Sequence, residues 1–439
     1  MSFKIDRQSV GELNLMGKFR QGSVYFLFNK VRTRIGEKLM DDMFSHPLND
    51  AAAINRRVAI FKFFEDKGMA FPFETDQVAL MREYIDITSS RSQWAVAAEL
   101  QVQKLLAILT KDGRFKNTLL QLQATIGTLK KCFGLLEWLK RENSPLQDQV
   151  EALLAILQQK DMRKILESDI YKPMSTRTVA DYDYLLRNRH NDAMKAVLQF
   201  IAETDVYMAV SQVSREKHFC YARAVDKAEN VFHAKGLRHP CINKAVGNDL
   251  HMQEGSNVLF LTGANMAGKS TWMKSIGIAM YMAHIGFPVA ATEMVCSVRE
   301  GIFSSINVAD NIAMGYSHFY AEVVRVKDAA LAAATGEHLL LMFDELFKGT
   351  NVKDAFDGTL AVTQGFSEYN NCLFIVSTHI IEVGAALKDL PNVQFRFMPT
   401  ILDGNIPRYT YTLQEGITED RQGMMIIENE GIIALINKM

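Results

Sequence analysis

In the first half of the chain, hydrophobic positions recur at alternating steps of four and three residues, the spacing of one face of an α-helix. The clearest stripe lies within residues 115–140 and consists of Phe115, Leu119, Leu122, Ile126, Leu129, Phe133 and Leu136. Pro145 cannot continue this helix, and a further helical pattern covers residues 191–213. We therefore predict an all-α domain over residues 1–235.

Beyond residue 235 the pattern changes to short, continuous apolar runs separated by helical segments. The runs at 257–263, 337–345 and 371–379 are predicted to be strands, and residues 270–286 a helix. Continuous apolar strands that alternate with helices indicate a parallel sheet covered on both faces. The sequence thus predicts a multidomain protein, in which the all-α domain is followed by an α/β domain over residues 236–439 with a mostly parallel sheet.

The composition is typical of a globular protein, with 48% hydrophobic and 23% charged residues. The chain has no run of 18 apolar residues, and its start lacks the apolar stretch of a signal peptide. Its five cysteines lie far apart and form no C-x-x-C pair, which argues against a zinc site or a disulfide framework. We expect a cytoplasmic protein that does not associate with a membrane.

Charge is divided unevenly between the two halves. Residues 1–235 hold 35 Lys+Arg against 29 Asp+Glu, whereas residues 236–439 hold 14 against 21. Within the long helical segment, residues 111–142 carry seven Lys/Arg and three Asp/Glu. This excess is either a solvated face opposite a packed stripe, or the basic face of an arm that lies near a polyanion.

Residues 263–270 read GANMAGKS and fit the pattern G-x-x-x-x-G-K-[ST], directly after a predicted strand and directly before a predicted helix. The glycines allow the backbone to wrap tightly, so that N–H groups at the helix N-terminus point at the β- and γ-phosphates of a nucleotide. Lys269 adds a positive charge, and the hydroxyl of Ser270 is placed to ligate Mg²⁺. The motif predicts a binding site for ATP and Mg²⁺.

The strand predicted over residues 337–345 ends in Asp344 and Glu345. Beside a phosphate-binding loop, Asp344 is predicted to hold Mg²⁺ through water, and Glu345 to polarise the water that attacks the γ-phosphate. The next predicted strand ends at His379, which could sense the γ-phosphate, although a lone histidine is more often structural.

Several stretches then resemble one family. TGANMAGKST at residues 262–271 resembles the phosphate loop TGPNMGGKST of the MutS family of DNA mismatch-repair ATPases. ADNIAMGYSHFYAEV at 309–323 resembles the family's signature ADDLASGRSTFMVEM, and DELFKGTNVKDA at 344–355 resembles DEIGRGTSTYDG. TRIGEKLMDDMFSHPLND, from Thr33, is similar to the opening of the family's core-lever domain, and YTLQEG and ENEGIIALIN are similar to its C-terminal dimerisation elements.

The resemblance assigns expected roles residue by residue. It implies that residues 1–235 are a helical core-lever domain and that residues 236–439 are the P-loop ATPase domain. It implies nucleotide contacts from Gly263, Asn265, Met266, Gly268, Lys269, Ser270, Thr271 and Val246, and Mg²⁺ ligation by Ser270 and Asp344. It implies catalytic roles for Glu345, His379 and Ser317, of which Ser317 would reach the γ-phosphate bound by the other subunit of a homodimer.

The chain also departs from the family pattern. Because the core-lever motifs begin within about 35 residues of Met1, we expect the mismatch-recognition and connector domains to be absent, and the DNA-gripping clamp to be reduced or missing. Tyr316 and His318 replace the usual Arg and Thr of the signature. Ala245 and Val246 stand where an aromatic residue of the family packs on adenine, which predicts weaker adenine packing.

Two functions from different classes follow. The first is a dimeric, ATP-hydrolysing protein of the DNA mismatch-repair type, which binds double-stranded DNA and uses the nucleotide as a conformational switch. The second is a nucleotide-gated scaffold that binds a protein partner with little or no DNA binding.

Overall fold

The computed structural model describes residues 3–87, 92–110, 113–306, 318–403, 406–418 and 435–436, and it contains two compact units that interleave along the chain. The first unit comprises Met1–Phe28, Phe44–Val58 and Val213–Met439, and the second comprises Asn29–Met43 and Ala59–Gln212. The predicted domains meet at a single boundary at residue 235, whereas the chain passes from one of these units to the other four times. The first unit contains the candidate chemistry.

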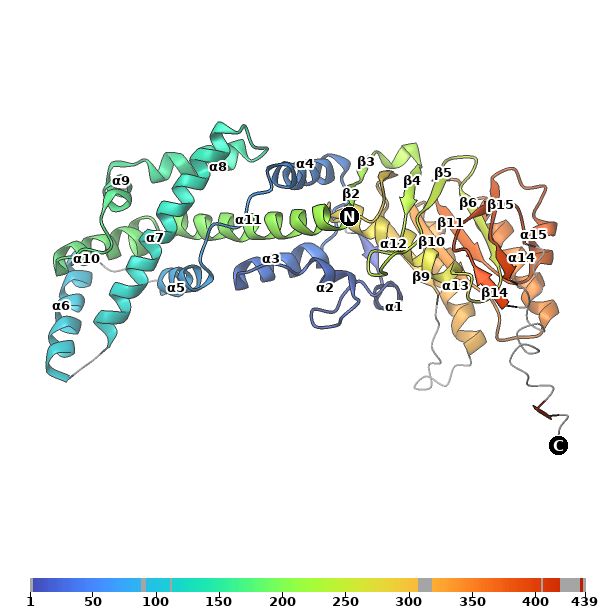
Figure 1. Cartoon of the computed structure of the whole chain (residues 1–439), viewed down its shortest axis with the longest axis horizontal. Helices are drawn as coiled ribbons and strands as arrows, with labels where there is room; N and C mark the ends of the chain where they lie inside the picture. The colour runs from blue at the N-terminus through green and yellow to red at the C-terminus, as the bar shows by residue number, and fades with distance from the viewer. Residues whose placement is uncertain are drawn as a thin grey trace. The chain divides into compact units, whose positions relative to one another are not determined.

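The first unit is organised around a seven-stranded sheet with the order β1-β9-β10-β11-β6-β12-β15 (Figure 1). All neighbouring pairs are parallel except β12 and β15, which are antiparallel. The strands are β1 Lys4–Ile5, β6 Val258–Gly263, β9 Gly301–Ser305, β10 Leu339–Asp344, β11 Leu373–Ser377, β12 Val393–Met398 and β15 Gln414–Glu415. The mostly parallel sheet and its three predicted strands, now β6, β10 and β11, are therefore confirmed.

Helices cover both faces of this sheet. They are α12 Lys269–His284, α13 His318–Ala334, α14 Val352–Ser367 and α15 Ile381–Ala386. Alternate residues of β10, including Leu341 and Phe343, share one core with residues of α13, α14 and α15. On the opposite face α12 packs so closely that a Cβ on Gly277 would lie 2.6 Å from Cε of Met342. Burial on both faces explains why these strands are continuously apolar.

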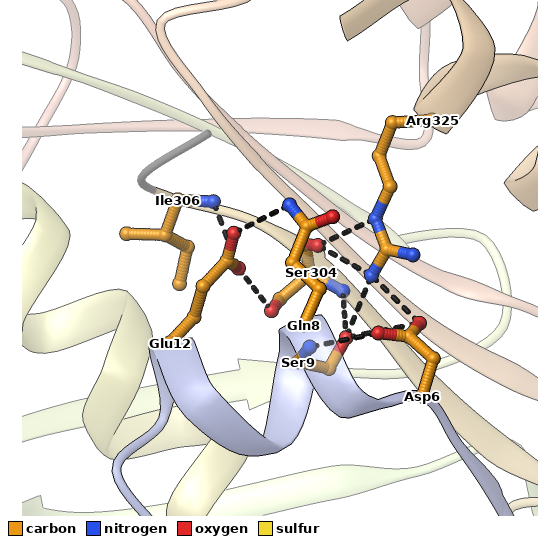
Figure 2. Close-up of polar contacts among 7 residues, drawn as sticks. All are labelled: Asp6, Gln8, Ser9, Glu12, Ser304, Ile306 and Arg325. Atoms are coloured by element: carbon orange, nitrogen blue, oxygen red, sulfur yellow. Dashed lines mark hydrogen bonds and ion pairs between the residues drawn. The ribbon is translucent and has the colours of Figure 1, made fainter. Parts of the chain in front are cut away.

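The first residues of the chain belong to this same unit. Strand β1 pairs with β9, and α1 (Arg7–Glu12) lies against β9 and α13. In Figure 2, Ser9 Oγ accepts a hydrogen bond from Ser304 N at 2.9 Å, and Glu12 accepts one from Ser304 Oγ. Arg325 donates to Ser9 Oγ and to Ser304 O, each at 2.8 Å, and lies 2.7 Å from a carboxylate oxygen of Asp6. Strand β1 and helix α1 therefore pack against the α/β sheet and form hydrogen bonds with it.

The prediction of an all-α segment over residues 1–235 is therefore wrong in part, since β1 and three further strands lie within or overlap that range. Strand β1 belongs to the seven-stranded sheet, whereas β2, β3 and β4 belong to smaller ones: a four-stranded sheet in the order β3-β8-β4-β5 and a two-stranded sheet of β2 and β7. Strands β13 and β14 form another pair. The strands are β2 Cys220–Tyr221, β3 Arg223–Val225, β4 Phe232–Leu237, β5 Asn248–Met252, β7 Pro288–Val289, β8 Glu293–Ser297, β13 Thr400–Asp403 and β14 Ile406–Tyr409. Strands of two or three residues are too short to show an alternating pattern.

The second unit is helical where the structure describes it. Its helices are α5 Thr75–Asp86, α6 Gln93–Thr110, α7 Arg114–Arg141, α8 Gln147–Leu157, α9 Lys160–Glu167 and α10 Thr176–Tyr184, followed by a π-helical turn η1 Leu185–Arg189. Helices α3 Arg34–Ser45, α4 Ala51–Lys67 and α11 Asn191–Lys217 cross from one unit to the other, α2 Val24–Phe28 lies in the first, and η2 Lys227–Glu229 is a 3₁₀ turn. Within the described ranges, no helix combines the length and the apolar character needed to cross a bilayer.

Helix α7 confirms the long helix predicted from the apolar stripe. Leu122, Ile126, Leu129 and Leu136 are buried in it, while the stripe's remaining members are partly buried. Three of the four lysines of this helix have partners inside the second unit: Lys131 lies 3.3 Å from Glu74, Lys140 lies 3.9 Å from Glu151, and Lys130 donates to the carbonyl of Ser168. These contacts favour the interpretation of a partly neutralised, solvated face.

The T-x-x-G pattern at Thr33 and Gly36 has a local physical cause. The carboxylate of Asp205 on α11 accepts hydrogen bonds from Thr33 N and Thr33 Oγ1, both at 2.7 Å, and from Arg32 N at 3.0 Å. A Cβ on Gly36 would lie 2.6 Å from Oδ2 of Asp205, so a glycine is required for this close approach. Burial raises the pKa of Asp205, and the hydrogen bonds from Thr33 and Arg32 oppose that rise.

Candidate nucleotide-binding site

The loop between β6 and α12 is shaped by three residues with positive φ. Gly263 has φ 144°, Met266 72° and Gly268 103°. A Cβ on Gly263 would lie 3.0 Å from the carbonyl oxygen of Met398 in the neighbouring strand, so the glycine allows the loop to leave the sheet beside β12. The loop then enters α12 at Lys269, and the first N–H groups of that helix are free of intrahelical partners.

Lys269 folds back into the curve of this loop. Its ammonium donates to the carbonyl of Gly263 at 2.7 Å and to that of Ala264 at 3.1 Å, and the residue is 5% exposed. Burial lowers the pKa of Lys269, while the nearby carboxylates of Asp344 and Glu345 oppose that shift. The loop therefore holds a positive charge at its centre, where a bound phosphate would meet it.

Asp344 ends β10 beside the loop, and its Oδ2 accepts a hydrogen bond from Ser270 Oγ. The parallel register places Asp344 next to Ser377, the last residue of β11. Burial raises the pKa of Asp344, and the bond from Ser270 opposes the rise. Its Oδ1 is buried without a hydrogen-bond partner of normal geometry in the described chain. A hydroxyl and a carboxylate with a free buried oxygen are donors that suit Mg²⁺.

Glu345 follows in a left-handed conformation with φ 53°, fixed by a hydrogen bond from its N–H to the carbonyl of Ser377 at 2.7 Å. Its carboxylate lies 3.7 Å from Nδ1 of His379 and 3.9 Å from Nζ of Lys348. His379 is the main cause that lowers the pKa of Glu345, and burial works against it. Strained conformations of this kind concentrate at functional sites. The structure thus brings together the two predicted catalytic residues that it describes.

A pocket of about 630 Å³ opens over the loop. Of the predicted residues, its lining contains Asn265, Met266, Gly268, Lys269, Ser270, Thr271, Val246 and Glu345. Gly263, Asp344 and His379 are not part of the lining, although Lys269, Ser270 and Glu345 contact them, respectively. Ser317 lies outside the described residues, as does Tyr316, and of His318 the structure describes the backbone that begins α13.

Comparison with known proteins identifies the segment that contains the loop. Residues 259–437 match the family model of MutS domain V. This segment is a MutS-family domain.

Curated relatives agree with this assignment. The DNA mismatch repair protein MutS of Halalkalibacterium halodurans is 29% identical over 263 residues, which is 57% of this chain and 30% of that protein. The MutS of Geobacillus thermodenitrificans is 30% identical over 255 residues, 56% of this chain and 27% of that protein. That of Petrotoga mobilis is 28% identical over 291 residues, 65% and 34% respectively. The chain therefore spans about a third of the length of these relatives, or less.

The pocket over the loop also contains residues that sequence reasoning missed. Tyr411 is the most informative, because it adds an aromatic side chain to the lining that also contains Ala245 and Val246. A Cβ on Gly268 would lie 3.0 Å from Cδ1 of Tyr411, so this ring packs directly on the loop. No spacing rule connects position 411 to position 268, because the contact forms through the fold. The prediction of weaker adenine packing considered only Ala245 and Val246, and it stays a prediction.

His239 is a second missed member of the lining. Its Nδ1 accepts a hydrogen bond from the N–H of Cys241 at 3.3 Å, so Nε2 carries the proton in the neutral ring. Burial, with a further contribution from Lys274, lowers the pKa of His239 to about 4. His239 is accordingly uncharged at neutral pH.

Proposed function

We propose that this chain binds and hydrolyses ATP with Mg²⁺. The observation that carries the proposal is the joint placement of Lys269 inside the loop and of Ser270 against Asp344, at the floor of a pocket large enough for a nucleotide. Its relatives are named DNA mismatch repair proteins, which supports an ATPase of that type.

The residues have distinct roles in the proposed reaction of ATP with water, which yields ADP and phosphate. The ammonium of Lys269 gives up its hydrogen bonds to the carbonyls of Gly263 and Ala264 and donates instead to oxygens of the β- and γ-phosphates. Ser270 and Asp344 hold Mg²⁺, which neutralises charge on the phosphate oxygens when it is bound. Glu345, kept ionised by its neighbour His379, orients and polarises the attacking water.

The base is proposed to lie between the apolar wall and the aromatic ring of the pocket. Val246 and Tyr411 are 39% and 46% exposed, so each presents a free face to a ligand. Stacking of a base on an aromatic ring contributes about 1–3 kcal/mol per base. The nucleotide would thus be held at both ends, by charge at the phosphates and by stacking at the base.

We further propose that the protein works as a homodimer in which Ser317 of one subunit completes the site of the other. ATP then closes the two ATPase domains, and the helical units convert this closure into a conformational switch on double-stranded DNA. The nucleotide-gated scaffold stays the second candidate, because Glu74 and Glu151 lie beside Lys131 and Lys140 within the second unit and offset part of the charge available for DNA.

The direct test is ATP binding by the full-length chain and by Lys269→Ala, in the presence of Mg²⁺. We expect the substitution to weaken ATP binding by about 10- to 100-fold, the effect of losing a charge-assisted contact. Lys353→Ala is the matched control, because Lys353 is exposed on α14 and does not line the pocket. Equal affinities for ATP in wild type and Lys269→Ala would remove the loop from nucleotide binding.

A further inference from the structure

Asn248, the first residue of β5, ties together two segments that are far apart in the sequence. Its side-chain amide Nδ2 donates to the carbonyl of Tyr411 at 2.9 Å, and its Oδ1 accepts from the N–H of Leu413 at 2.7 Å. The two bonds enclose Thr412 between them. The residue is 7% exposed, so water competes little for either bond.

The position of Asn248 is itself closely determined. A Cβ on the preceding Gly247 would lie 2.8 Å from the carbonyl oxygen of Gly236, which shows how tightly β5 approaches β4 here. The register pairs Asn248 with Leu237 across the two strands. Because this backbone is constrained, the side chain of Asn248 holds its two hydrogen-bond partners in place.

What it binds is a strained residue. Tyr411 has φ 58°, a left-handed conformation that costs free energy for a residue with a Cβ. Thr410 adds one tether, because its Oγ1 donates to the carbonyl of Pro399 at 3.2 Å. In this conformation the Tyr411 ring packs on Gly268 of the phosphate loop and faces the pocket.

We propose that Asn248 is a positioning residue, which holds Tyr411 in its left-handed conformation so that the ring forms the platform for the base of a nucleoside triphosphate. This inference rests on the proposed nucleotide site and adds to it the residue that sets base affinity. Without the amide, Tyr411 relaxes to a conformation with negative φ and its ring leaves the loop. The phosphate contacts of Lys269 and Ser270 do not depend on Asn248.

The test compares two probes on the full-length chain with Mg²⁺: ATP, which carries a base, and inorganic tripolyphosphate, which carries none. Asn248→Ala is expected to weaken ATP binding about 5- to 10-fold and to leave tripolyphosphate binding within about twofold of wild type. Tyr411→Gly removes the ring, and glycine tolerates the positive φ. It should weaken ATP binding about 10- to 30-fold and leave tripolyphosphate binding within about twofold of wild type.

A double substitution tests whether Asn248 affects ATP binding through the ring of Tyr411. In the Tyr411→Gly background, Asn248→Ala should weaken ATP binding by no more than about twofold, because the ring that it positions is already gone. If Asn248→Ala weakens ATP and tripolyphosphate equally, if it leaves ATP binding unchanged, or if its effect persists in full without the ring, the inference is wrong.

Controls separate this role from a purely structural one. Asn257, which directly precedes β6, is also buried, and its Nδ2 donates to the carbonyls of Tyr369 and Cys372. Asn257→Ala should lower the melting temperature without changing the ratio of ATP to tripolyphosphate affinity. Should Asn248→Ala not fold, Asn248→Asp keeps the acceptor for Leu413 and loses the donor to Tyr411. Because Asn248 also lines the pocket, the added charge weakens both anionic probes, so the readout is the ratio of ATP to tripolyphosphate affinity, which should fall as in Asn248→Ala. A wild type that binds neither probe would instead overturn the proposed function.

Discussion

Both ring nitrogens of His284, at the end of α12, are engaged in hydrogen bonds inside the core. Nδ1 donates to the carbonyl of Leu48 at 2.7 Å, and Nε2 accepts from the N–H of Arg299 at 3.1 Å. Protonation of Nε2 would break the second bond and place a charge beside the buried Arg299 guanidinium. Burial accordingly lowers the pKa of His284 to about 4, although the bond to Leu48 opposes the shift.

This neutral histidine predicts a pH-dependent stability. Its folded-state pKa of about 4 lies below the value of 6.5 for a free histidine, so the unfolded chain binds the proton more readily. The free energy of unfolding should therefore fall by about 1.4 kcal/mol per pH unit as pH decreases from about 6.5 to about 4. His284→Gln, which cannot titrate, should reduce this slope in urea unfolding curves.

The comparison of slopes has a clear control. His251 is exposed on β5, so His251→Gln should leave the wild-type slope unchanged. His239 has a pKa of about 4 as well and keeps part of the slope in His284→Gln. A slope that His284→Gln does not alter would show that His284 is protonated at no cost in the folded state.

At the scale of single residues, a sequence indicates which side chains come together where the contact is local or set by strand register. Lys269 and Ser270 follow the loop by a fixed spacing, and Asp344 reaches Ser270 because parallel strands end at one edge of the sheet. Tyr411 had no such signal. Its approach to Gly268 requires a left-handed residue and the clamp by Asn248, which a sequence does not show without the fold.

Among the helices, Gly36 of α3 and Gly134 of α7 have opposite surroundings. Gly36 in α3 faces Asp205, where a Cβ would lie 2.6 Å from Oδ2 and 3.0 Å from Thr33 Oγ1. Gly134 in α7 is exposed, and a Cβ there would have no heavy atom within 4 Å. Both lie in the second unit, so they can be compared in one unfolding measurement.

The two Gly→Ala substitutions are expected to change stability in opposite directions. Gly36→Ala should destabilise the chain by about 1–3 kcal/mol, because the methyl group would push the carboxylate away from its three donors. Gly134→Ala should stabilise it by about 0.5–1 kcal/mol, since alanine loses less backbone entropy in a helix. Urea unfolding followed by circular dichroism measures both. A destabilising Gly134→Ala, or a neutral Gly36→Ala, would contradict this account of the two helices.

Long elements with a continuous pattern were predicted well. Strands β6, β10 and β11 and helices α7 and α12 follow from runs of apolar residues or from a helical stripe. The two-residue strand β1 and the π-helical turn η1 were not predicted, because neither has enough residues to show a period. Strand β1 exists through its pairing with β9, and α1 through its contacts with Ser304 and Arg325.

On the scale of the whole molecule, the open question is what the helical unit contacts. If it binds duplex DNA through about four phosphates, affinity should fall on the order of 100-fold between 50 and 200 mM salt. The measurement is a duplex-binding titration at these two salt concentrations, with and without ATP. Salt-sensitive binding in one nucleotide state supports the DNA-binding switch. Binding that is undetectable or insensitive to salt in every state supports the scaffold instead.

The compact units could not be predicted from the sequence as they are. Three of their four boundaries fall inside helices α3, α4 and α11, which have no break in pattern where they pass from one unit to the other. The contacts of a dimer are likewise not predicted from the sequence of one chain, because they lie between two copies. Solution measurements must therefore test the role proposed for Ser317.

The dimer proposal predicts that hydrolysis depends on chain concentration. If Ser317 acts on the site of the other subunit, the ATPase rate per chain should rise with concentration and reach a plateau when the dimer is saturated. Glu345→Gln should bind ATP but hydrolyse it far more slowly at every concentration, which would assign the measured rate to this site. A rate per chain that stays constant down to strictly monomeric concentrations would contradict the proposal.

A mixture of two inactive chains makes the same prediction more specific. Ser317→Ala keeps its phosphate loop, and Lys269→Ala keeps its Ser317, so each homodimer should be inactive for a different reason. In a mixed dimer, the loop of the first chain meets the serine of the second, and one of the two sites is complete. Random pairing of equal amounts should therefore restore about a quarter of the wild-type rate, since half of the dimers are mixed and each has one working site. If mixed dimers form and the mixture is no more active than its components, Ser317 acts within its own chain or not at all.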